Sequence, residues 1–143
     1  MHYSTGRRSV AATLLGATIA LQVAETAQAW TAGFGHVSAA DRRLRPGCHD
    51  YRYHYVARPR SNDWMLETWL RDPRHRPRGS GDFAAGSDPK RGYAHFGICR
   101  STVVPGRFTI RARLTWWTPG ALPTDPEMKH VRWFRPAHFR LHR

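Results

Sequence analysis

The sequence predicts an all-β fold, an antiparallel sandwich of two packed sheets that follows a cleavable N-terminal segment. Several short segments alternate apolar and polar residues with the period of two typical of strands, and turns rich in Pro and Gly separate them. After the first 29 residues, no stretch shows the periodicity of an amphipathic helix. The chain has 143 residues, of which 41% are hydrophobic. These values predict one packed domain and argue against a disordered chain.

The N-terminal segment has the features of a secretory signal peptide. Arg7 and Arg8 precede a mostly apolar, uncharged run over 10–23, and a small-x-small cleavage site, Ala-Gln-Ala, follows at 27–29. The run has about 14 residues, whereas a transmembrane helix needs about 20, so an uncleaved anchor is the weaker alternative. The paired arginines leave both the general secretory and the twin-arginine routes open. We therefore expect a secreted protein that begins at Trp30 and has no membrane span after signal removal.

The chain divides into three parts: the signal peptide over 1–29, a lead-in over 30–47 with room for one edge strand, and a β-sandwich domain over 48–143. Within the domain, stretches dense in Pro and Gly predict loops. These loops are expected over 71–81 and 118–127. Strands are expected over 51–56, 64–70, 83–85, 93–100 and 107–117, with one or two more over 131–143 around Pro136.

The clearest predicted strand covers 107–117, because its eleven residues keep one register and so define an inner and an outer face. The inner face carries Phe108, Ile110, Ala112, Leu114 and Trp116, and the outer face carries Thr109, Arg111, Arg113, Thr115 and Trp117.

Cys48 and Cys99 are the only cysteines. An even pair in an exported protein predicts one disulfide, and closing a loop of about 50 residues contributes roughly 4 kcal/mol in the chain-entropy model. A cysteine nucleophile served by His49 or His95 would require a reduced thiol outside the cell and is the weaker interpretation. A zinc site is weaker still, since neither cysteine has a partner at zinc-knuckle spacing.

The order Cys48, Trp64, Cys99, with a segment over 105–110 like a final hairpin, resembles immunoglobulin-like β-sandwich domains. The resemblance covers residues 48–117 and departs from antibody-type domains at Gly97, where those domains have a tyrosine. The sequences WLRDP and CRST also make the chain similar to small secreted, uncharacterised proteins of high-GC Gram-positive bacteria. The resemblance implies a secreted immunoglobulin-like sandwich, and it implies no activity.

The formal net charge of +13 predicts attraction to polyanions, namely nucleic acid, anionic lipid or acidic wall polymers. No dedicated nucleic-acid motif accompanies this charge. The charge has a second interpretation, because Lys90 and Lys129 are the only lysines and arginine codons are GC-rich. We expect an anionic cell-wall polymer, a glycan or a protein as partner.

The candidate ligand-binding residues are Arg111, Arg113 and Trp117, since an indole beside two guanidinium groups can stack a sugar ring or a base, or bind an acidic glycan. The alternative is that Trp117 stacks on its own arginines or lies under the C-terminal tail. Carboxylates are few and stand mostly in turns, so we assign no catalytic residue and no cofactor. His138 and His142, with His130 nearby, form a borderline metal motif that we interpret as surface histidines.

Two hypotheses remain. The first is a secreted, non-catalytic basic β-sandwich module that binds a polyanion, glycan or protein. The second is a small secreted hydrolase or metal-dependent enzyme whose site the sequence does not reveal. An enzyme needs a concave pocket with converging titratable groups, whereas a binding module needs only an exposed patch.

Overall fold

A computed structural model describes residues 32–143 of the chain. The predicted signal peptide and the mature N-terminus at Trp30 therefore lie outside the described residues. Between residues 32 and 143 no helix has the length and apolar character required to cross a bilayer.

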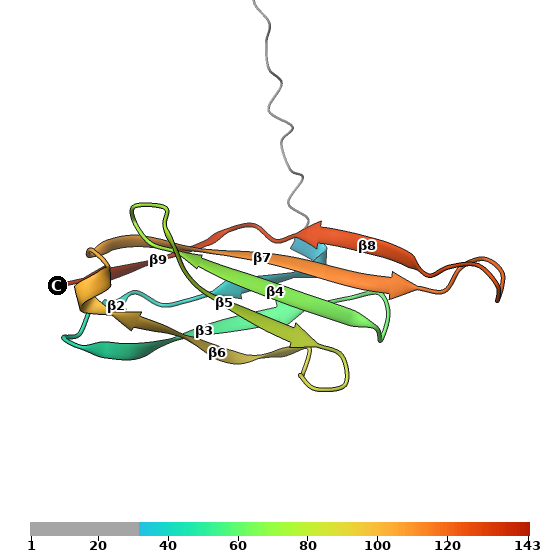
Figure 1. Cartoon of the computed structure of the whole chain (residues 1–143), viewed down its shortest axis with the longest axis horizontal. Helices are drawn as coiled ribbons and strands as arrows, with labels where there is room; N and C mark the ends of the chain where they lie inside the picture. The colour runs from blue at the N-terminus through green and yellow to red at the C-terminus, as the bar shows by residue number, and fades with distance from the viewer. Residues whose placement is uncertain (1–31) are drawn as a thin grey trace, which may run out of the picture.

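The described residues form two packed sheets, which Figure 1 shows as two layers. Short 3-10 turns, η1 and η2, occupy Ala32–Phe34 and Arg100–Thr102. The three-stranded sheet has the order β1-β3-β6, with β1 at Gly35–Ser38, β3 at Cys48–Ala57 and β6 at Arg91–Cys99. The six-stranded sheet has the order β2-β9-β7-β4-β5, and β8 also pairs with β7. Its strands are β2 (Arg42–Arg43), β4 (Trp64–Arg71), β5 (Pro77–Ala84), β7 (Gly106–Thr118), β8 (Met128–Trp133) and β9 (Ala137–His142).

The all-β prediction with two sheets is confirmed, but the pairing is not antiparallel throughout. Strand β2 pairs with β9 in parallel, so the larger sheet is a curled, mixed half-barrel. The segment expected to hold one edge strand contributes both β1 and β2. The expected C-terminal region contains two strands, β8 and β9, and the β7–β8 hairpin reaches past the ends of the other strands (Figure 1).

The core lies between the sheets and is centred on β7. The predicted register of this strand is confirmed, because all its inner-face residues are at most 2% exposed. Burying a side chain such as Leu114 contributes about 1.5–3 kcal/mol relative to leaving it in water. The opposing layer supplies three tyrosines of β3 at alternate positions, each at most 4% exposed: Tyr51, Tyr53 and Tyr55.

A buried hydrogen-bond chain joins the two sheets. Thr68 donates its hydroxyl hydrogen to the carbonyl of Gly81 (3.1 Å), so the Tyr53 hydroxyl, 2.8 Å away, donates to Thr68. Burial raises the pKa of Tyr53 above its usual 10.0, although the Thr68 hydrogen bond opposes this, and the tyrosine remains a donor at neutral pH. A Cβ added at Gly81 would lie 2.8 Å from the Tyr53 hydroxyl, so glycine is required there.

Strand β5 corrects the prediction of a loop over 71–81 and a short strand over 83–85. It begins at Pro77 and pairs with β4. The prediction was wrong because Pro and Gly have other roles here. As an edge strand, β5 tolerates a proline at its start, and a Cβ added at Gly79 would come within 3.2 Å of the Phe96 ring in the other sheet.

The predicted disulfide between Cys48 and Cys99 is confirmed, with an S–S distance of 2.00 Å. The two cysteines are register partners at one end of the β3–β6 ladder, so the bond joins neighbours within one sheet. In immunoglobulin domains the corresponding bond joins the two sheets. Trp64 is buried, as the resemblance implies, but in the other sheet. The immunoglobulin-like architecture therefore stays a prediction.

Candidate functional site

The predicted ligand-binding residues Arg111 and Arg113 lie on the outer face of β7, where both are half-buried. Arg113 stands opposite Glu67 of β4 in the sheet register. Its Nη2 and Nε atoms lie 2.6 and 2.7 Å from one carboxylate oxygen of Glu67. Arg113 is therefore already paired with a carboxylate, which reduces the charge it offers to a ligand.

Two tryptophans that we did not assign to the site, Trp69 of β4 and Trp133 of β8, contact these arginines. The Arg111 guanidinium lies 4.8 Å from the Trp133 ring centroid, and that of Arg113 lies 5.4 Å from Trp69. The two indole centroids are 5.6 Å apart, and a hollow of about 220 Å³ lies beside them.

Trp117 takes no part in this cluster. It lies four residues beyond Arg113 on β7, about 13 Å away at ~3.3 Å per residue, and pairs with Lys129. The outer face of β7 thus brings the two predicted arginines together with Trp69 and Trp133 instead of Trp117. Cross-strand register determines this grouping, and no periodicity within a single strand reveals it.

A larger hollow, of about 580 Å³, lies where β2 of the six-stranded sheet and the residues after it come beside β3 and β6 of the three-stranded sheet. We call it the arginine groove. Its lining residues are Arg42, Arg43, Arg45, Asp50, Tyr51, Arg52 and His95.

One wall of the groove is held in place by Leu44, which is 1% exposed and belongs to the core. The Leu44 N–H donates to the carbonyl of His142 (2.7 Å), which continues the pairing of β2 with β9. Because Leu44 points inward, its neighbours Arg43 and Arg45 are exposed. The buried Tyr51 hydroxyl accepts from the Arg45 N–H (3.1 Å) and donates to the Arg43 carbonyl (3.4 Å), so this wall is bound to β3.

The other wall is the outer face of β3 and β6. Arg52 stands between the buried Tyr51 and Tyr53, so the alternation of the strand turns it outward. In the ladder Arg52 pairs with His95 of β6, which places both side chains on the same face. Residues from three separate segments therefore meet in this groove.

The arginines of the groove have no carboxylate partner among the described residues. Over residues 32–143 the ion pairs are Arg78–Asp72 and Arg113–Glu67, so no groove arginine has a carboxylate oxygen within 4.0 Å. Four arginines and Asp50 give the lining a formal charge of +3 with His95 neutral. Guanidinium forks match phosphate, sulfate and carboxylate oxygens in pairs, so the groove is suited to an anion.

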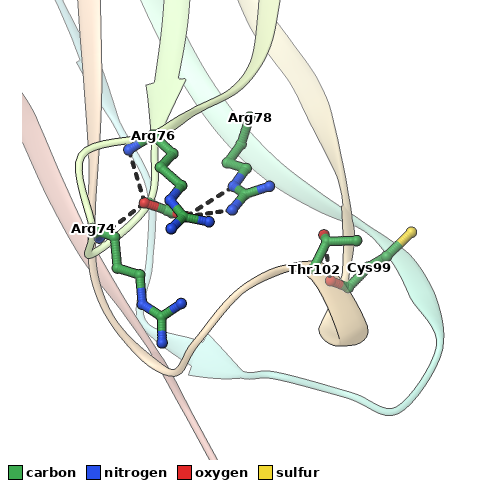
Figure 2. A network of polar contacts seen from close by, with 6 residues as sticks. Arg74, Arg76, Arg78, Cys99 and Thr102 are labelled. Atoms are coloured by element: carbon green, nitrogen blue, oxygen red, sulfur yellow. Dashed lines mark hydrogen bonds and ion pairs between the residues drawn. The ribbon is translucent and has the colours of Figure 1, made fainter.

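The Arg-rich loop after β4 uses its main chain and Arg78 for structure. The buried Asp72 carboxylate accepts hydrogen bonds from the Arg74 and Arg76 N–H groups (2.8 and 2.9 Å) and from Arg78 Nε (2.8 Å), as Figure 2 shows. Burial by itself raises the pKa of Asp72, but these hydrogen bonds and the Arg78 charge outweigh it and lower the pKa below its usual 3.8. The carboxylate therefore remains ionised and orders the loop.

The three histidines of the metal motif do not meet. His130 stands opposite Trp116 and His138 opposite Thr109, positions about 23 Å apart along β7 at ~3.3 Å per residue. Each is bonded locally, His130 to Thr118 (2.9 Å) and His138 to Thr109 (3.0 Å). Among residues 32–143 no group of three potential ligands could hold a metal ion.

Comparisons with protein-family models, curated proteins and solved structures found no match to this chain. The function is therefore argued from the site itself.

Proposed function

We propose that the protein is a secreted, non-catalytic module that binds an anionic polymer in the arginine groove. The observation that carries the proposal is the set of four arginines, on two separate segments, that line one hollow and have no carboxylate partner within 4.0 Å in the part of the chain that the structure describes. The positive charges of clustered arginines repel one another, and a bound anion relieves that repulsion. Removal of residues 1–29, which contain two arginines and one glutamate, leaves a net charge of +12, which would draw a polyanion to the surface from a distance.

Secretion and the immunoglobulin-like architecture are parts of the same proposal. The signal peptide over 1–29 and the order Cys48, Trp64, Cys99 support them, and a disulfide is consistent with an extracellular protein. An acidic polymer of the cell wall or an anionic glycan would then be accessible to the module. The mass of the protein recovered from culture medium tests secretion, since cleavage after Ala29 leaves Trp30 at the N-terminus.

The groove is tested by replacing Arg42 and Arg52 with Ser and titrating the variant with polyphosphate and with a heparin oligosaccharide. Loss of two groove charges should weaken binding at least about tenfold and flatten its salt dependence, because fewer counterions are released. The matched control replaces Arg74 and Arg76, exposed residues that do not line the groove and use only their main-chain N–H groups to bind Asp72.

The control carries the same loss of net charge but leaves the lining of the groove intact, so it should bind within about twofold of the unmodified protein. Equal losses of affinity in both variants would show that binding depends on net charge and not on the groove. Shortening of either polymer during the titration would favour the alternative, a small secreted hydrolase.

A further inference from the structure

A second hollow adjoins the arginine groove on the three-stranded sheet. Its volume is about 390 Å³, and it shares Arg42 and Arg52 with the groove. The two hollows are therefore neighbours along β3, with Arg52 between them. The remaining lining residues are Ser38, Ala39, Ala40, Tyr53, His54 and Tyr93.

Tyr93 is the distinctive residue of this second hollow. It is 63% exposed, although large apolar side chains on this protein are otherwise mostly buried. Its ladder partner His54 lies 5.0 Å away between ring centroids, and the Arg52 guanidinium lies 4.5 Å from the Tyr93 centroid. Tyr93 is not one of the core residues, so its exposed ring is accessible to a ligand.

The short side chains Ser38, Ala39 and Ala40 border the hollow and leave room above the tyrosine ring. Arg52, as a shared residue, can hold an anionic group while a ring attached to that group reaches Tyr93. A sugar ring fits this arrangement, because its C–H face packs on an aromatic ring while its hydroxyls bond to groups such as Ser38 and His54.

We propose that the paired hollows recognise an anionic glycan, with the charged group in the arginine groove and its sugar ring against Tyr93. This inference rests on the proposed function and adds the chemical class of the ligand. A nucleobase would stack on the same ring, so it is kept as an outcome of the test below. The expected secretion favours a glycan over a nucleic acid.

The test compares three probes: a heparin oligosaccharide, which carries rings; polyphosphate of similar charge, which carries none; and single-stranded oligothymidylate. Tyr93→Ala should weaken heparin binding about tenfold, the order of one lost ring contact, and leave polyphosphate binding within about twofold. Tyr93→Phe keeps the ring and should bind heparin within about twofold of the unmodified protein. Because Tyr93 is exposed, neither variant should change the unfolding midpoint.

Arg45→Ser separates this inference from the proposed function, since Arg45 lines only the groove. It should weaken heparin and polyphosphate binding alike. If it does so while Tyr93→Ala leaves heparin binding unchanged, the glycan inference is wrong and the anion groove stands. If Arg45→Ser weakens neither probe, the groove itself is wrong. A loss of oligothymidylate binding without loss of heparin binding in Tyr93→Ala would assign the hollow to a nucleic acid and overturn the glycan.

Discussion

Arginines occupy the outer faces of both sheets, but their surroundings differ. On the six-stranded sheet, Arg113 is paired with Glu67, and Arg111 lies over the Trp133 ring. In the arginine groove, beside the three-stranded sheet, Arg43 and Arg45 are held outward by the buried Leu44 and have no carboxylate oxygen of residues 32–143 within 4.0 Å. Arginine side chains are thus packed and paired on the six-stranded sheet, whereas those of the groove are available to a ligand.

The comparison shows that net charge alone does not locate a binding surface. A guanidinium already paired with a carboxylate must give up that partner before it binds a ligand, which cancels much of the gain. An unpaired guanidinium exchanges only water and counterions for the ligand. The variants below separate structural arginines from available ones, beginning with the largest expected effect.

The largest effect is expected directly beneath the six-stranded face, at Leu114, which is 0% exposed. Leu114→Ala removes core volume and should lower the free energy of unfolding by about 2–5 kcal/mol, as core truncations do. Urea unfolding measures it. A loss below 1 kcal/mol would contradict the core assignment and weaken every statement about which face of β7 is outward.

Arg78 has a third kind of environment, because its charge is paired with the buried carboxylate of Asp72 and stabilises the loop. Asp72→Ala should cost about 2–3 kcal/mol at pH 7, because it removes hydrogen bonds to a buried charged group. Since the pKa of Asp72 is lower in the folded protein, its stabilisation is present above pH 3.8 and is lost as pH falls below that value. Acid unfolding of the variant should therefore show a shallower loss of stability below pH 3.8 than the unmodified protein. An identical pH profile would argue against this role.

The double substitution of Arg111 and Arg113 by Ser tests the site expected from sequence alone. We now expect binding of polyphosphate to fall by less than about threefold, because Arg113 is already paired with Glu67. Stability should fall by about 1 kcal/mol, since the contacts with two indoles are lost. Titration and thermal unfolding measure both quantities. A tenfold loss with a flatter salt dependence would instead restore the outer face of β7 as the binding site.

The smallest effect is expected from Glu67→Gln, which releases Arg113 without removing it. Arg113 is 37% exposed, so the lost ion pair should cost at most about 0.5 kcal/mol of stability. Polyphosphate affinity should rise by up to about twofold, since one more guanidinium becomes available. A decrease in affinity would show that Glu67 orients Arg113 for binding.

The strands with strict alternation could be predicted from sequence because burial imposes a period of two on them. Strand β7 is the clearest case, since every residue assigned to its inner face is buried. Strand β5 could not be predicted, because Gly79 and Gly81 resemble turn residues until the rings packed against them are known. The disulfide followed from an even cysteine count, and its place within one sheet did not.

The candidate site was predicted only in part. Arg111 and Arg113 could be placed on an outer face, but their contact with Trp69 depends on register between strands that are far apart in sequence. The arginine groove was missed because Arg43 and Arg52 meet only after the chain turns back at Gly47, whose φ of 82° favours glycine. Leu44 between two arginines was the one local signal, an apolar residue that had to turn inward.

The position of the Cys48–Cys99 bond has a consequence for how the three-stranded sheet comes apart. Among residues 32–143, strand β6 is an edge strand that pairs with β3 alone, and the disulfide links the two strands at one end of that ladder. Peeling must therefore begin at Arg91 and travel toward Cys99, so amide protons near Tyr93 should exchange with solvent before those near Ile98. A ligand that spans both hollows would hold the end of β6 that the disulfide does not link and would slow hydrogen exchange of the amides near Tyr93.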